Sequence, residues 1–79
     1  MTKNEILSQA LEARIQEVLH YQINIDNYTI ALKKIAELSI EEQQELSAFA
    51  EQLRGLLASE ILEQKKAKIM LSVIEEQLK

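Results

Sequence analysis

Leu38-Ser39-Ile40-Glu41-Glu42 is the stretch that decides the fold of this chain. Ser39 and Glu42 have the S-x-x-E spacing of a capping box, in which the two side chains satisfy backbone N–H groups at the start of a helix. No proline occurs anywhere, and the only glycine, Gly55, lies well inside the following segment. The chain is therefore predicted to turn round at residues 38–39.

Two long segments with the period of a helix flank this turn. Thr2-Lys3-Asn4-Glu5 is another capping box, so the first helix should begin near residue 3. Residues 21–30 also alternate like a strand and contain poor helix formers, and we expect a bend or weak spot near residues 24–27. Apolar residues spaced alternately by three and four form two seams of the coiled-coil kind. The first seam comprises Leu7, Leu11, Val18, Tyr21, Ile25, Tyr28, Leu32 and Ile35, and the second comprises Leu46, Phe49 or Ala50, Leu53, Leu57, Ile61, Ala67, Leu71, Ile74 and Leu78.

The predicted fold is therefore all-α. It is a single domain over residues 1–79, an antiparallel hairpin with helices at about 3–37 and 40–78. A chain of 79 residues buries little core and often needs a partner or a staple. The chain has no cysteine and one histidine, so neither a disulfide nor a zinc site can supply additional stability, and oligomerisation is the remaining way to gain it.

Composition excludes several classes of function. The net charge of −4 disfavours nucleic-acid binding, and no apolar run reaches the ~18 residues of a membrane span. The N-terminus lacks the apolar core of a signal peptide, which favours a cytoplasmic location. Glu17 and His20 form one E-x-x-H pair, whereas a di-iron bundle needs more inward carboxylates. We expect no metal, no cofactor and no catalytic residues, and therefore no enzyme.

Arg14 is a charge within the first seam. A reversal at residues 38–39 places residue i level with about residue 77 − i, so that Arg14 lies near Glu63, with Glu60 one turn away. We predict an ion pair between Arg14 and one of these glutamates, within or between subunits, which would set the helix register. The alternative is that Arg14 extends to solvent. The same register places Tyr21 beside Gly55, Tyr28 against Phe49 and Leu7 against Met70.

The two helices carry more apolar residues than one hairpin can bury. Exposed apolar patches of this kind mark interfaces, so a homodimeric four-helix bundle is expected to cover most of the surplus, and a second protein the rest. The predicted interface residues are Ile15, Leu19, Ile23, Ile30, Leu56, Leu62, Ile69, Met70 and Val73.

Two short stretches resemble a known family. Met1-Thr2-Lys3 and Glu37-Leu38-Ser39-Ile40-Glu41-Glu42-Gln43 are similar to the Rop family of plasmid-encoded hairpins, over about ten residues. The resemblance implies a dimer that binds paired RNA loops. The family uses basic and polar residues on the exposed face of its first helix, where this chain has Glu5, Glu12, Ile23 and Ile30, so the activity does not carry over. The general shape is also similar to that of helical-hairpin co-chaperones and small phage inhibitors, without a shared motif.

The leading hypothesis is a non-enzymatic protein-binding module, a homodimeric hairpin that acts as an adaptor, chaperone or inhibitor. The alternative is a Rop-like RNA-binding bundle, and an enzyme comes third.

Overall fold

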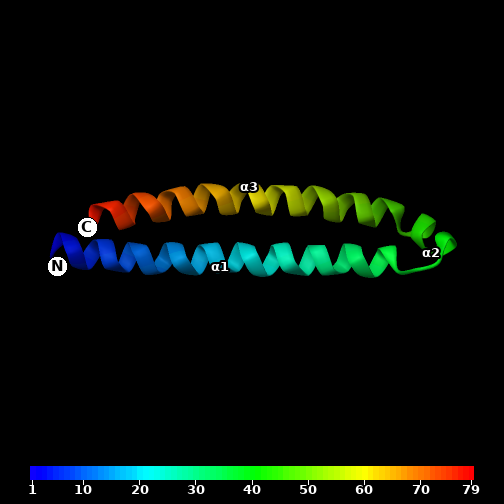
Figure 1. Ribbon diagram of the computed structural model, residues 1–79, viewed down its shortest axis with the longest axis horizontal. Coiled ribbons are helices and arrows are strands. Elements are labelled where there is room, and N and C mark those ends of the chain that lie inside the picture. Colours follow the sequence, from blue (N-terminus) through cyan, green and yellow to red (C-terminus); the bar gives the residue numbers. More distant parts are fainter.

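Two long antiparallel helices form the hairpin, and a short helix closes it at one end (Figure 1). The computed structural model describes residues 1–79 and contains α1 (Lys3–Ala36), α2 (Ile40–Glu45) and α3 (Ser47–Gln77). The molecule is a rod of 60 × 17 × 14 Å, with both chain termini at the end opposite the turn. The predicted all-α hairpin is confirmed.

Local interactions explain why α1 is long and continuous. The Thr2 hydroxyl accepts a hydrogen bond from the Glu5 N–H at 3.2 Å, and Lys33 and Lys34 lie in the last turn, where the helix dipole favours cations. The helix runs through residues 24–27 without a break, and the expected bend or weak spot there stays a prediction. Its polar residues bond along the helix there: Thr29 donates to the Ile25 carbonyl at 2.7 Å, and Gln22 donates to Asp26 at 2.9 Å.

The turn uses Ser39 as predicted. Ser39 is extended, with ψ of 159°, and its hydroxyl accepts from the Glu42 N–H at 3.3 Å. The Glu42 carboxylate accepts from the same hydroxyl at 3.2 Å, which stabilises the cap further. Gln43 donates to the carbonyls of Ala36 and Leu38 at 3.2 and 2.9 Å. These bonds occupy carbonyls that the end of α1 leaves unpaired.

The second arm is interrupted at Leu46, where the sequence predicted one helix from residue 40 to 78. Leu46 has φ −99° and ψ 9°, outside helical values, and separates α2 from α3. Gln43 holds α2 against the end of α1, whereas α3 packs along α1. The change of direction between these two contacts therefore falls at Leu46.

The predicted register is displaced by about seven residues. Asn24 bonds to Glu60, and Gln64 bonds to Val18 and Gln22, so residue i of α1 lies level with about residue 84 − i of α3. The turn takes up α2 as well as residues 38–39, which moves every facing pair by about two helical turns.

Ser39→Ala should lower the free energy of unfolding by about 1 kcal/mol, because the hydroxyl caps α2. Urea unfolding followed by circular dichroism, at one fixed protein concentration, measures the change. Ser72→Ala is the matched control, since Ser72 is exposed and makes no side-chain hydrogen bond. Equal effects of the two substitutions would contradict the role assigned to Ser39.

Candidate functional site

The seam between α1 and α3 is thin. Only five residues of the chain are buried, and all lie on α3: Ala50, Leu53, Gln64, Ala67 and Ile74. Every predicted seam residue of α1, together with Arg14, is half-buried. Each long helix therefore covers only one side of the other, and most of its circumference stays in water.

The seam of α3 follows a strict heptad spacing that includes two polar residues. After Leu53 and Leu57 the seam continues through Glu60, Gln64 and Ala67, which are buried or half-buried, whereas Ile61 is exposed. The prediction that Ile61 belongs to the seam is wrong, because it preferred an apolar residue over the regular spacing. Ala50 rather than Phe49 occupies the earlier seam position.

A polar layer joins the helices near their middle. Gln64, only 7% exposed, donates to the Gln22 side chain at 2.8 Å and to the Val18 carbonyl at 3.3 Å. Asn24 donates to Glu60 at 3.3 Å. No buried side-chain polar atom is left without a partner. Sequence reasoning missed Asn24, Gln22 and Gln64, although the heptad spacing points to position 64.

The predicted interhelical ion pair of Arg14 is not formed within the chain. Arg14 contacts Glu17, one turn along α1, at 3.1 Å. Glu63 contacts Lys66 at 3.0 Å, and Glu60 contacts Asn24. The physical reason is the register, which puts Arg14 level with about Met70 and brings Asn24 to Glu60.

The prediction that Tyr21 lies beside Gly55, where a residue without a side chain would leave room for the ring, is also wrong. A Cβ atom added there would meet nothing within 4 Å, so Gly55 does not make room for Tyr21. The predicted contacts of Tyr28 with Phe49 and of Leu7 with Met70 came from the same register and are wrong for the same reason.

All nine predicted interface residues are exposed. They do not form one surface. The hairpin has one flank on each side of its seam and an outer face on each helix, and helical spacing places these residues on different ones. Asn24 bonds to α3 on one side of the seam, and Gln22 bonds to α3 on the other side. Residues seven positions apart lie on the same face of a helix, so these two residues identify which flank their heptad neighbours belong to.

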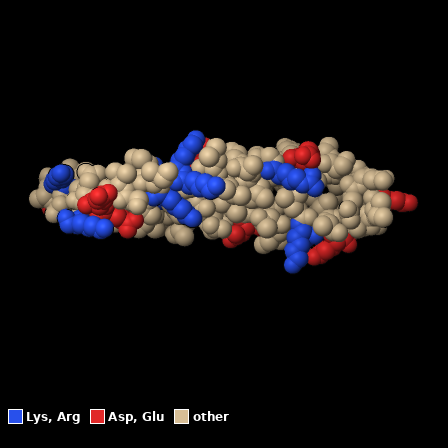
Figure 2. Space-filling view, turned by 45° about the horizontal axis from the view of Figure 1, so that its top comes forward, with Lys and Arg blue, Asp and Glu red and all other residues tan.

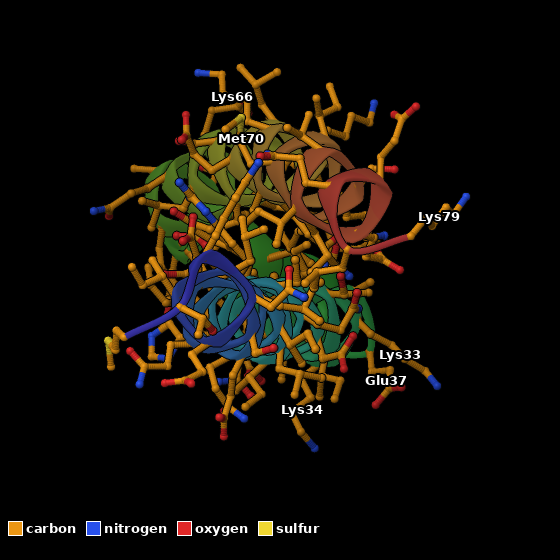
Figure 3. All side chains as sticks on the ribbon, turned by 90° about the vertical axis from the view of Figure 1, so that its left-hand side faces the viewer. Lys33, Lys34, Glu37, Lys66, Met70 and Lys79 are labelled. Atoms are coloured by element: carbon orange, nitrogen blue, oxygen red, sulfur yellow. The ribbon has the colours of Figure 1, made fainter.

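The flank on the side of Asn24 has mostly small apolar residues on α1 and large apolar residues on α3. We call it the alanine flank, and its apolar members are Ile6, Ala10, Ala13, Ala31, Phe49, Leu56, Met70 and Val73. Met70 points away from the hairpin in the end-on view of Figure 3. The flank on the side of Gln22 is the charged flank, with Glu5, Glu12, Asp26, Lys33, Glu51, Arg54, Lys65, Lys68 and Glu75.

A second exposed apolar group lies along α1. We call Ile15, Leu19, Ile23 and Ile30 the α1 stripe. By heptad spacing, Ile15 and Leu19 lie on the charged flank, and Ile23 and Ile30 lie on the outer face, away from the seam. Leu62 and Ile69 lie on the outer face of α3.

The two signs of charge are interspersed over the face shown in Figure 2. No group of three or more His, Asp and Glu residues is close enough together to hold a metal ion, and no pocket is formed. Neither long helix is apolar enough to cross a bilayer.

Fold and surface together define the molecule as an antiparallel helical hairpin with a polar seam layer and two exposed apolar regions. Comparison with family models, with curated proteins and with solved structures finds no match for this chain.

Gln64→Ala should destabilise the hairpin by about 1–2 kcal/mol, because it removes two interhelical bonds and leaves a gap in the seam. Gln64→Leu should be within about 1 kcal/mol of the parent or more stable, since an apolar side chain of similar size fills the space. Urea unfolding at one protein concentration compares the two. A leucine variant as unstable as the alanine variant would contradict this account of the layer.

Proposed function

We propose that this chain is a non-enzymatic protein–protein interaction module, a homodimeric hairpin that acts as an adaptor, chaperone or inhibitor of another protein. The observation that carries the proposal is the surplus of exposed surface. The chain exposes 5961 Å², whereas a compact monomer of 9.1 kDa exposes about 4,900 Å². The difference, about 1,100 Å², is comparable to the roughly 800 Å² that each partner buries in a stable interface.

The nature of that surface supports the same proposal. Fourteen large apolar side chains are exposed, while only four apolar residues are buried. Single exposed apolar residues are ordinary, but successive ones on the same helix face form a continuous patch that association covers. A dimer of two hairpins has the layout of a four-helix bundle, in which each helix gains a second neighbour.

One dimer interface does not cover every apolar face of a hairpin. The α1 stripe and the alanine flank lie on different sides of α1, so an interface on one leaves the other in solvent. We assign the α1 stripe to a second protein, which would contact its isoleucine and leucine side chains in the manner of a helix face in an apolar groove.

Ile23→Glu combined with Ile30→Glu should abolish binding of the second protein, because both residues are more than half exposed and a groove that accepts them would have to bury two carboxylates. Helicity should not change, since neither side chain lies in the seam. Circular dichroism checks the helicity, and an affinity pull-down from the native cell checks the binding.

The matched control is Ala58→Glu combined with Ser72→Glu, which adds the same charge at exposed positions one heptad from Glu51 and Lys65 on the charged flank, away from the alanine flank and from the two substituted isoleucines. Retention of every bound protein by the isoleucine variant, together with an unchanged dimer, would show that the α1 stripe is not an interface.

RNA binding is the competing hypothesis, and the charge distribution argues against it. Thirteen acidic residues outnumber nine basic ones, and the α1 stripe is apolar and bordered by Glu12 and Asp26. We expect no salt-sensitive retention of paired RNA loops in a filter-binding assay. Retention that falls with salt and is lost on Lys3→Ala or Arg14→Ala would support the RNA-binding hypothesis instead.

A further inference from the structure

We propose that a second copy of this chain docks on the alanine flank with the two turns at the same end of the bundle, so that α3 of each copy lies against α1 of the other. This inference rests on the self-association proposed above and adds the face and the direction of the second copy.

The alanine flank is the broad face with the lowest cost of dehydration. Its eight apolar residues come from both helices, and it carries five charged residues, whereas the charged flank would have to bury nine. The five are Lys3, Glu17, Lys34, Glu63 and Lys66. The two acidic residues near the middle of the alanine flank, Glu17 and Glu63, already have intrahelical partners in Arg14 and Lys66. Docking a second copy on this flank therefore removes little water from charges that lack a partner.

The sizes of the side chains favour α3 against α1. Large residues lie on α3 and alanines lie on α1 at nearly the same heights along the rod. The observed register places Met70 and Val73 about level with Ala13 and Ala10, and Leu56 within one turn of Ala31. A two-fold axis parallel to the rod preserves height, so the large side chains of each copy meet the alanines of the other, as knobs do in holes.

The charges favour the same direction. Gln64 bonds to Val18 and Gln22, so Glu63 is about level with His20, and Lys66 is about level with Glu17. With the turns at the same end, Lys66 faces Glu17 of the second copy, and Glu63 faces His20 of the second copy. An imidazole N–H donates to a carboxylate whether or not the ring is charged. By symmetry each contact occurs twice.

The opposite direction is disfavoured by one of these residues. With the turns at opposite ends, α3 lies against α3 of the second copy. Glu63 is near the middle of α3 (Ser47–Gln77), and it would then lie close to Glu63 of the second copy. Exposed ion pairs add little affinity, but like charges brought together select against an arrangement.

Spin labels measure the direction. The chain has no cysteine, so Glu41→Cys in α2 supplies one nitroxide site per copy, at the turn, without altering α1 or α3. Double electron–electron resonance should give an intersubunit distance below about 40 Å, because neighbouring helices in a bundle are only about 10 Å apart. A distance near the 60 Å length of the rod would overturn the direction proposed. The absence of any intersubunit coupling at tens of micromolar would overturn self-association as well.

Two adjacent residues test the face. Met70 is 42% exposed on the alanine flank, and Ile69 is 63% exposed on the outer face of α3. Met70→Glu should weaken dimerisation by about a hundredfold, since each dimer would bury two new carboxylates, whereas Ile69→Glu should leave the dissociation constant within about threefold. Sedimentation equilibrium measures both constants, and circular dichroism checks that both variants are helical. Equal effects, or a larger effect of Ile69→Glu, would overturn the choice of the alanine flank.

Discussion

A helix with one neighbour can bury only one stripe of its surface, and this constraint governs the whole molecule. α1 and α3 run side by side along a rod 60 Å long and contact each other through a single seam. Four apolar residues are buried in that seam, two of them alanines. Others are half-buried along the seam, and fourteen large apolar side chains stay exposed. Conformational entropy opposes the ordering of every residue in the rod, so a seam this thin leaves little free energy of folding unless more surface is covered. Self-association is the simplest way in which the second side of each helix becomes a contact.

Polar residues occupy part of the seam between α1 and α3. Gln64 is buried and bonds to Gln22 and Val18, and Asn24 bonds to Glu60. Apolar residues at these positions would add more burial but would allow the helices to slide past each other by a heptad with little penalty. A slide of seven residues would leave Gln64 buried without its partners. The polar layer therefore sets the register at some cost in stability, which is consistent with a hairpin that gains further contacts on its flanks.

Ser39 made the fold predictable, and α2 made the register unpredictable. A capping box depends on residues three apart, so the turn and the two-helix architecture followed from local sequence. The height at which two helices face each other depends on how the chain fills the turn, and Gln43 and Leu46 settle that through tertiary contacts. For this reason the predicted pair of Arg14 with Glu60 or Glu63 does not form within the chain, and a pair between subunits stays a prediction. Gln64 was missed for another reason: hydrophobicity selected Ile61 for the seam, whereas the strict three–four spacing leads from Leu57 through Glu60 to Gln64. The exposed apolar residues were predictable because they are simply those that the seam does not use.

Whether the hairpin is complete by itself is the central question, and its mass in solution answers it most directly. Sedimentation equilibrium or native mass spectrometry at micromolar concentration should give about twice the 9.1 kDa of one chain. The corresponding circular dichroism spectrum should show a fully helical protein. A stable, helical monomer of 9.1 kDa at the same concentration would contradict the account, because the surplus surface would then need no second copy.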